Sequence, residues 1–188
     1  MRQLDKDYFS FDFDGVIADT DDLKYTVAKD LGFVSCTNAC PKKSLSELSP
    51  TEISNVNQCV YSDPAMILRL KPKDDAIETI GWLQKQGVLC QVVTSREGCH
   101  HNSLKEWFAK FELAIHIECV GVGKNKTPFL EYSKVFVDNR INNLLPAIGC
   151  VRYLFYMSDT STNLLKENSD IVTVYNWQDL KDKLQTLV

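Results

Sequence analysis

The sequence predicts an α/β fold, a doubly wound parallel sheet with a small helical segment inserted after its first strand. Three observations lead to this prediction. Short apolar runs alternate along the chain with amphipathic helical stretches, which is the pattern of parallel βαβ units. Residues 21–73 break that rhythm, because no strand-like run occurs among them. Acidic or hydroxyl side chains stand where several of the apolar runs end.

Six apolar runs are predicted as strands, because each is short and is separated from the next by a helical or turn-forming stretch. The first, residues 8–13, is rich in aromatic side chains and stops at Asp14 and Gly15. The later strands are expected at residues 88–94, 114–120, 134–137, 151–156 and 171–174.

Helical periodicity fills the gaps between these strands. Gly87 lies just past the end of one such stretch, the usual place of a helix-terminating glycine. At another stretch Thr127 is expected to cap the helix and Pro128 to occupy its first turn. The helices are expected at residues 74–86, 101–111, 128–132, 142–148, 162–167 and 177–187.

The inserted segment, residues 21–73, is expected to be a separate helical unit, which leaves residues 1–20 and 74–188 for the core. Ser49 and Glu52 have the S-x-x-E spacing of a capping box, with Pro50 at the first helical position. The pair formed by Asp63 and a following proline predicts another helix start.

Composition limits the class of function. The chain is 44% hydrophobic and 24% charged, which is typical of a globular protein. A net charge of −4, spread without long runs of either sign, argues against a nucleic-acid polymer or a membrane surface as partner. No apolar run approaches the roughly 18 residues of a membrane helix, and residues 1–7 are too polar for a signal peptide. We expect a cytoplasmic protein whose partner is a small molecule, a phosphorylated metabolite included.

The seven cysteines are odd in number and scattered without a CxxC pair. This pattern favours free thiols over a disulfide framework. Cys99, His100 and His101 are adjacent, but no second ligand pair stands at zinc-site spacing, so a polar loop or helix start is favoured over zinc.

The end of the first predicted strand carries two acids. Asp12 and Asp14 are two residues apart, so in continued strand geometry they project to one side and Phe13 to the other. Open α/β sheets bind ligands at the carboxyl ends of their strands. One carboxylate can attack an electrophile such as phosphorus while the other moves a proton, and a hard cation can offset their repulsion.

Two other interpretations of this acid pair stay open at this point. The spacing fits part of a calcium loop with Gly15 at the loop glycine, although Asp21 stands where a bidentate Glu is expected and a strand precedes the loop instead of a helix. The second alternative is a purely structural acidic turn.

Three later positions complete a constellation in chain order. Thr94 and Ser95 end the second predicted strand and offer donors to a phosphate oxygen. Lys126, or Lys124 close by, places a cation before a predicted helix start, and Asp138 ends another apolar strand. Each position also has a structural interpretation, as a strand-end hydroxyl, a solvated lysine or a helix cap.

Together these residues resemble the haloacid dehalogenase superfamily of phosphohydrolases. Residues 11–20 look like the first motif of that family and residues 94–96 like its second, while Lys126 and Asp138 fit the third and fourth. Residues 94–96 and 138–140 look closest to the nucleotidase branch.

The resemblance implies a Rossmann-like core and a role for each position. Asp12 would be the nucleophile that forms an aspartyl-phosphate, and Asp14 would protonate the leaving oxygen and then activate water. Mg²⁺ would be held by Asp12, the backbone carbonyl of Asp14 and Asp138. The inserted segment would be a type 1 cap over the site. The phosphoryl oxygens would be held by Thr94, Ser95 and Lys126.

Two features depart from the family pattern. Where the family usually carries a second acid in its fourth motif, this chain has Asn139 and Asn142. The asparagines would bind metal-bound water in the outer shell, or alternatively cap the following helix. The cap is small and carries no specificity signature; the candidate substrate contacts are Arg96, Lys24, Tyr25, Tyr61 and Arg69.

The leading hypothesis is a Mg²⁺-dependent phosphatase acting on a small phosphomonoester, with a nucleoside monophosphate among the candidates. Halide displacement is disfavoured, because an acid/base at Asp14 serves phosphoryl transfer. The alternative is a non-catalytic module that uses the fold to bind a ligand or a protein. Asn139 and Asn142 favour that alternative, and the retention of both Asp12 and Asp14 argues against it.

Overall fold

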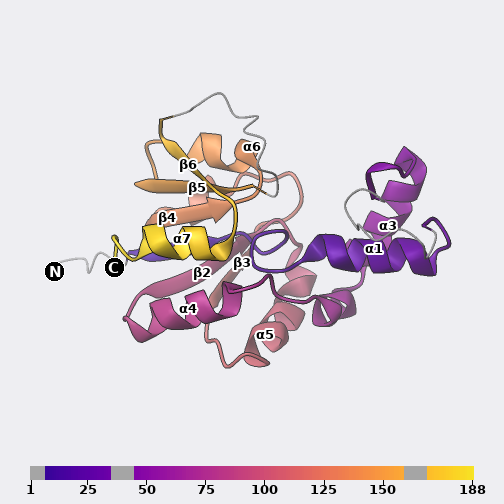
Figure 1. Ribbon diagram of the computed structural model, residues 1–188, viewed down its shortest axis with the longest axis horizontal. Helices are drawn as coiled ribbons and strands as arrows, with labels where there is room; N and C mark the ends of the chain where they lie inside the picture. The colour runs from indigo at the N-terminus through magenta and orange to yellow at the C-terminus, as the bar shows by residue number, and fades with distance from the viewer. Residues whose placement is uncertain (1–6, 35–44, 159–168) are drawn as a thin grey trace.

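The computed structural model describes residues 7–34, 45–158 and 169–188. Its six-stranded sheet is parallel throughout and has the order β3-β2-β1-β4-β5-β6 (Figure 1). The strands are β1 (Tyr8–Phe11), β2 (Leu89–Thr94), β3 (His116–Cys119), β4 (Ser133–Asp138), β5 (Tyr153–Met157) and β6 (Ile171–Val174).

The central position of β1 fixes where a ligand can bind. The chain leaves β1 for β2 and β3 on one side, and later returns to β4, β5 and β6 on the other. This reversal is a topological switch point, and in such sheets the crevice beyond the carboxyl ends of the strands is the ligand site. The predicted doubly wound parallel α/β sheet is confirmed.

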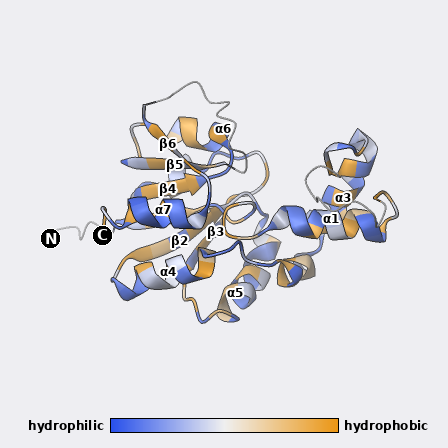
Figure 2. Cartoon of the chain, in the orientation of Figure 1, coloured by the Kyte–Doolittle hydropathy of each residue, from blue (hydrophilic) through white to orange (hydrophobic). Residues whose placement is uncertain are grey.

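Helices cover both faces of the sheet. Val92 belongs to a buried cluster with Leu104 and Leu180, whereas the next residue, Val93, packs with Leu144 in a second cluster. Neighbouring residues of a strand point to opposite faces, so the two clusters lie on opposite sides of the sheet. Figure 2 shows the apolar strands between these helices. The first cluster contains α4 (Ala76–Lys85), α5 (His101–Ala109) and α7 (Trp177–Leu184), and the second contains α6 (Ile141–Leu144).

Two tryptophans hold the chain just before the inserted segment and near its end. The ring of Trp177 lies 5.4 Å from that of Phe11, and its Nε1 donates a 2.8 Å hydrogen bond to the carbonyl of Val16. The ring of Trp107 meets Phe13 edge to face at 5.1 Å, and its Nε1 donates to the carbonyl of Leu70 at 2.8 Å. Buried indole groups with satisfied N–H donors hold these turns in place.

The inserted segment contains α1 (Thr20–Asp30), α3 (Pro50–Ser62) and the 3₁₀ helix η1 (Pro64–Arg69). Figure 1 shows α1 and α3 extending to one side of the sheet. The predicted capping box of Ser49 and Glu52 is confirmed, and the predicted helix start at residue 63 is confirmed as a 3₁₀ turn. Among the residues described, no helix combines the length and apolarity needed to cross a bilayer.

The first strand and one helix differ from the prediction. The first strand ends at Phe11, because the chain turns: Ile17 and Ala18 donate hydrogen bonds back to the carbonyl of Phe13. The stretch 142–148 is not one helix, because Pro146 lacks an N–H and α6 gives way to the 3₁₀ helix η4 (Leu145–Ala147). The helix expected at 162–167 lies outside the described residues.

The predicted helix at 128–132 is also wrong. The structure has one 3₁₀ turn, η3 (Thr127–Phe129), which Lys126 precedes as its N-cap, so Thr127 is not the cap. Ser133 already begins β4 and donates to the carbonyl of Leu130, which leaves no room for a further helical turn.

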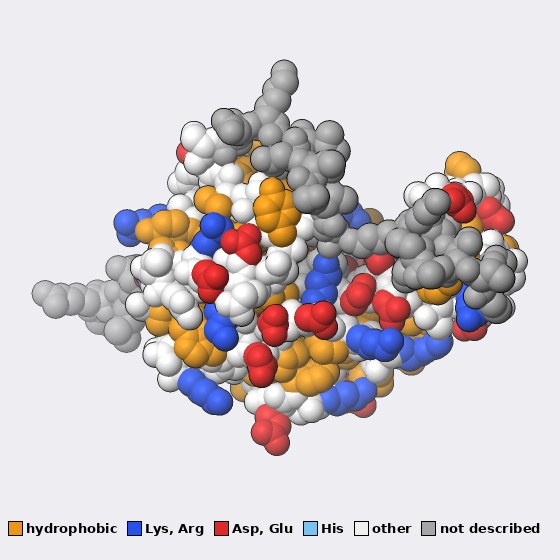
Figure 3. Space-filling model, in the orientation of Figure 1, with side chains coloured by type: hydrophobic (Ala, Val, Ile, Leu, Met, Phe, Trp, Pro, Cys, Tyr) orange, Lys and Arg blue, Asp and Glu red, His pale blue; other side chains and the backbone are white. Residues whose placement is uncertain are grey.

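The described cysteines are Cys59, Cys90, Cys99, Cys119 and Cys150, and all five are free. Cys36 and Cys40 lie outside the described residues. Figure 3 shows acidic and basic side chains interspersed over one face of the molecule, which agrees with the lack of long charged runs in the sequence.

Candidate active site

The turn after β1 places two acids at one cavity. The N–H of Asp12 donates to the carbonyl of Val137 at 2.9 Å, which ties the turn to β4. Phe13 is fully buried, while Asp12 and Asp14 both line a cavity of about 490 Å³. The predicted divergence of Phe13 from the two acids is therefore confirmed, although the turn replaces continued strand geometry. Gly15 has φ +76°, and a Cβ there would collide with the side chain of Asn139.

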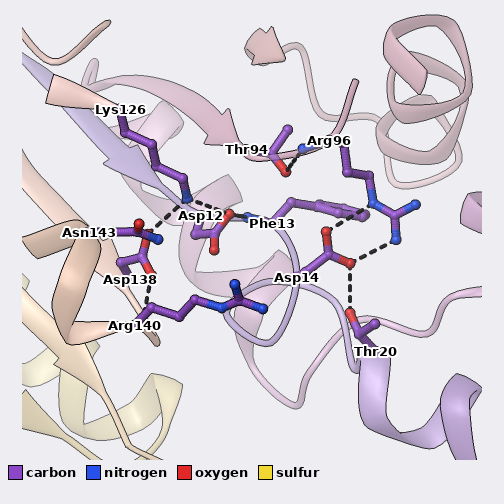
Figure 4. Close-up of polar contacts among 10 residues, drawn as sticks. All are labelled: Asp12, Phe13, Asp14, Thr20, Thr94, Arg96, Lys126, Asp138, Arg140 and Asn143. Atoms are coloured by element: carbon purple, nitrogen blue, oxygen red, sulfur yellow. Dashed lines mark hydrogen bonds and ion pairs between the residues drawn. The ribbon is translucent and has the colours of Figure 1, made fainter. Parts of the chain in front are cut away.

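Lys126 lies between two carboxylates. Its Nζ is 2.8 Å from Oδ1 of Asp12 and 2.8 Å from Oδ2 of Asp138, and the residue is 1% exposed (Figure 4). Burial opposes the charge of Lys126, but the two carboxylates outweigh burial and raise its pKa, so the amine is a cation. Lys124 is exposed on the cavity wall, so the structure gives the contact with Asp12 to Lys126.

The buried position of Asp12 favours the neutral form of its carboxyl. Burial raises the pKa of its carboxyl to about 7; Lys126 opposes that rise, and the nearby charge of Asp138 adds to it. A further cation beside Asp12 would favour the ionised form. The carboxylate would then be available as a nucleophile at neutral pH.

Asp138 is positioned by a residue that the sequence did not reveal. Its Oδ1 accepts from the N–H of Arg140 at 2.8 Å, and its Oδ2 accepts from Lys126 and from Nδ2 of Asn143 at 2.9 Å. Asn143 is on α6, one turn beyond the strand end. The contact could have been predicted only from a helix that begins at Ile141, because such a helix brings the side chain of Asn143 back to Asp138.

Asp14 forms a bidentate ion pair with Arg96. Nε of Arg96 donates to Oδ2 at 2.9 Å and Nη2 donates to Oδ1 at 2.8 Å, while the hydroxyl of Thr20 also donates to Oδ1 at 2.8 Å. The guanidinium lies 5.8 Å from the ring of Phe13 and 5.0 Å from the ring of Tyr61. Arg96, expected as a substrate contact, is thus a partner of the acid in this structure.

The second motif divides between the interior and the cavity. Thr94 is fully buried, and its hydroxyl accepts a 3.3 Å hydrogen bond from the N–H of Arg96. Ser95 lines the cavity.

Of the four candidate contacts from the inserted segment, Tyr61 alone lines this cavity. Nζ of Lys24 lies 5.2 Å from the centre of the Tyr61 ring, and burial lowers the pKa of that lysine. Tyr25 packs against the hydrophobic core, and the exposed Arg69 is 4.0 Å from Asp30. The structure therefore does not bring Tyr25 or Arg69 to the cavity.

The two asparagines of the fourth motif occupy different environments. The side chain of Asn139 packs on Gly15, and its Oδ1 is buried without a hydrogen-bond partner among the described residues. Asn142 is exposed on the cavity wall. Arg140 is the N-cap of α6 and no side chain caps that helix, so the capping alternative is wrong for both asparagines.

Arg140 and His100 are among the cavity residues that the sequence did not reveal. Arg140 lines the cavity, and Figure 4 shows its side chain extended between the Asp138 and Asp14 sides of the site. His100, four residues after Arg96 in the chain, also lines the cavity and is 3% exposed. The adjacent Cys99 and His101 made this histidine look like part of a polar loop.

The oxygen donors fit a magnesium ion. Proteins bind Mg²⁺ through one or two carboxylates together with water and substrate phosphates. Asp12 and Asp138 supply two carboxylates to the same amine, and the orphaned Oδ1 of Asn139 is a hard donor beside the turn that carries Asp14. Within the described ranges no group of three or more His, Cys, Asp or Glu side chains could hold a metal, so backbone oxygen, water and substrate phosphate would supply the remaining ligands.

Comparison with known proteins places the fold. No family model matches the sequence, and no curated protein sequence matches it. A haloacid dehalogenase-like hydrolase from Streptococcus pneumoniae is similar in structure, with TM-score 0.63 and 15% identity over 98% of this chain and 99% of that chain. A haloacid dehalogenase-like family hydrolase from Xanthomonas campestris gives TM-score 0.62 and 11% identity over 96% and 95%. CbbY from Rhodobacter sphaeroides, solved with phosphate, gives 0.59 and 15% over 93% and 96%.

Proposed function

We propose, from the premise that this chain has the haloacid dehalogenase fold, that it is a Mg²⁺-dependent phosphatase acting on a small phosphomonoester. The observation that carries the proposal is the position of Lys126, whose Nζ is 2.8 Å from both Asp12 and Asp138, where Asp12 and Asp14 line a cavity. A nucleophile, a proton carrier and a buried cation at one strand-end crevice are the groups that phosphoryl transfer needs.

In the first step Asp12 attacks phosphorus with a carboxylate oxygen and forms an aspartyl-phosphate. The bond from phosphorus to the ester oxygen breaks, and Asp14 gives its proton to that leaving oxygen. Oδ2 of Asp14 accepts one hydrogen bond, from Arg96, while Oδ1 accepts two, so Oδ2 is the oxygen better placed to carry the proton. Lys126 stabilises the negative charge on the phosphoryl oxygens.

In the second step Asp14, now a carboxylate, takes a proton from water. The water oxygen attacks phosphorus, the bond to Asp12 breaks, and the products are inorganic phosphate and regenerated Asp12 and Asp14. Arg96 keeps Asp14 oriented through both steps, because the bidentate pair fixes the plane of the carboxylate.

Mg²⁺ would be held by Asp12, the backbone carbonyl of Asp14 and Asp138. When bound, the ion neutralises charge on the carboxylates and on the phosphoryl group. Thr94, Ser95 and Lys126 would hold phosphoryl oxygens, and residues 21–73 would act as a cap that brings Tyr61 to the cavity.

The test is release of phosphate from p-nitrophenyl phosphate, measured with Mg²⁺ and with a chelator. We expect release with Mg²⁺ and a loss of at least tenfold with chelator, since the charges of three acids and a phosphate are then poorly balanced. No release from any phosphomonoester, with a folded protein and Mg²⁺ present, would favour the binding-module alternative.

Asp12→Asn is expected to stabilise the metal-free protein at pH 8. The folded-state pKa of Asp12 is raised to about 7, so the buried carboxyl costs no stability below its ordinary pKa and progressively more as the pH rises to 7. Asparagine imitates the neutral form at every pH. We expect Tm to exceed that of wild type at pH 8 by a few degrees, or roughly 1–2 kcal/mol, with the difference narrowing as the pH falls below 7 and closing only near the ordinary pKa of 3.8. A difference that is constant with pH would remove the titration of Asp12 as its cause.

Asn139→Asp is expected to lower the Mg²⁺ concentration for half-maximal activity several-fold. The new charge would stand at the buried orphan position of Oδ1, beside the turn that carries Asp14. Outer-shell partners tune metal affinity by ~10–100-fold, and repulsion from the existing acids offsets part of that gain. Asn142→Asp is the matched control, because its exposed charge is screened by solvent. Magnesium titrations that shift equally in both variants, or in neither, would contradict the outer-shell role of Asn139.

A further inference from the structure

Two buried polar atoms on the cavity wall are left without partners. Arg96 and His100 both line the cavity, and each is 3% exposed. Nη1 of Arg96 and Nε2 of His100 have no hydrogen-bond partner in the described part of the chain. Buried polar groups in native proteins are nearly always paired, so this wall is incomplete without a further group.

Arg96 contributes a donor. Its Nε and Nη2 are engaged by Asp14, and the faces of its guanidinium lie near the rings of Phe13 and Tyr61. The Nη1 edge of the guanidinium is the part without a partner among the described residues. Since guanidinium nitrogen only donates, this edge requires an acceptor.

His100 contributes an acceptor. Its Nδ1 lies 3.2 Å from the carbonyl oxygen of Glu97, which can only accept, so Nδ1 carries the proton. The thiol sulfur of Cys99, 3.4 Å from the same nitrogen, is a weak second acceptor for that proton. In the neutral ring Nε2 therefore has a lone pair, and it requires a donor.

A ligand that completes this wall must both accept and donate hydrogen bonds. The hydroxyl of an alcohol both accepts and donates. A carboxylate or a second phosphate only accepts, so it satisfies Arg96 alone. An alkyl group satisfies neither Arg96 nor His100. A nucleobase edge could also do both, but it needs an aromatic face to stack on. The Tyr61 ring, which is the aromatic side chain on this cavity, already contacts Arg96 at 5.0 Å and Lys24 at 5.2 Å.

We propose that Arg96 and His100 form the leaving-group subsite of this phosphatase and that its substrates are phosphomonoesters of polyols or sugars. The proposal rests on the proposed function and names its substrate class. Both atoms are shielded in this arrangement, with Tyr61 of α3 over Arg96 and η1 packed against η2 (Gly98–His100). The ligand therefore reaches them when the α3–η1 part of the inserted segment moves aside.

The experiment measures binding without turnover, by calorimetry on Asp12→Asn with Mg²⁺ present. Glycerol 1-phosphate is compared with propyl phosphate, which has the same carbon chain and no hydroxyls. We expect glycerol 1-phosphate to bind roughly 10- to 100-fold more tightly, because each unpaired polar atom then gains a partner. Phosphoglycolate should fall between the two. Equal affinities, or tighter binding of a nucleoside monophosphate or of phosphoglycolate than of glycerol 1-phosphate, would overturn the proposal.

Two substitutions at His100 separate recognition from a structural role. In His100→Asn the amide can still donate to the carbonyl of Glu97, but no atom stands at the position of Nε2. In His100→Gln an amide oxygen can stand near the position of Nε2, but the bond to Glu97 is lost. We expect His100→Asn to lose the preference for glycerol 1-phosphate about five- to tenfold and His100→Gln to retain most of it. The opposite order would assign His100 a structural role and overturn the subsite.

His101→Gln is the matched control, since His101 is adjacent but does not line the cavity; its preference should equal that of the unsubstituted background. Should the His100 variants fail to fold, the ligand comparison on Asp12→Asn alone decides the proposal. A polyol preference in binding with no hydrolysis by wild type would overturn the proposed function and leave the subsite. Hydrolysis by wild type with no polyol preference in binding would overturn the subsite and leave the proposed function.

Discussion

Asp12→Asn is expected to reduce turnover to background, a loss of at least ~10⁴-fold, because an amide of nearly the same shape is a poor nucleophile. The structure makes the substitution conservative for the fold. Asn Oδ1 can still accept from the N–H of Phe13, as Asp12 does at 2.8 Å, and Lys126 keeps Asp138 as its counter-ion. Phosphate release at saturating substrate, with a circular dichroism spectrum like wild type, is the measurement.

Asp74→Asn provides the matched control for Asp12→Asn. Asp74 is an exposed acid two residues before α4 and is not among the residues that line the cavity. Its turnover should equal that of wild type. Wild-type turnover in Asp12→Asn itself would remove Asp12 from the chemistry.

Asp14→Asn is expected to lose ~10²–10⁴-fold in turnover of an alkyl phosphate, the usual contribution of a positioned general acid. The same variant should lose far less in the first step on p-nitrophenyl phosphate, because nitrophenolate leaves without a proton. Half-saturation by Mg²⁺ should stay near that of wild type, since only the backbone carbonyl of Asp14 is proposed as a ligand.

The loss of the ion pair with Arg96 is a second cause for any effect of Asp14→Asn, and a further variant separates the two causes. Asparagine breaks half of the bidentate pair, so Arg96 could move and disturb the cavity. Thr20→Val removes the third contact of Asp14 while leaving its charge, and it should cost about tenfold or less. A large loss of Mg²⁺ affinity in Asp14→Asn with little change in saturated rate would show that the acid/base assignment is wrong.

The fold could be predicted because its determinants are local. The alternation of apolar runs located all six strands, and the residues at helix ends, such as Gly87 and Ser49, marked boundaries that the structure reproduces. The predictions of secondary structure were wrong where a single residue changed the local conformation. Pro146 divided one predicted helix, and the early start of β4 at Ser133 shortened another to a single 3₁₀ turn.

The candidate site was predicted only in part, because side-chain pairing between distant elements leaves no local signal. Placing acids and a lysine at strand ends follows from topology, and Asp12, Lys126 and Asp138 do lie together. The pairing of Arg96 with Asp14 joins residues 82 positions apart, and nothing in either local sequence indicates it. The choice between Lys124 and Lys126 required knowledge of burial.

The proposed mechanism depends most on a covalent intermediate at Asp12. Asp14→Asn, mixed with p-nitrophenyl phosphate and Mg²⁺ and quenched in acid, should accumulate that intermediate, because the leaving group needs no proton but the attacking water does. Mass spectrometry of the peptide that contains Asp12 is the most direct measurement. We predict a burst of nitrophenolate equal to the enzyme concentration and one added phosphoryl group, located on Asp12. A burst with the phosphoryl group on another residue, or steady turnover with an unmodified Asp12 peptide, would contradict the mechanism.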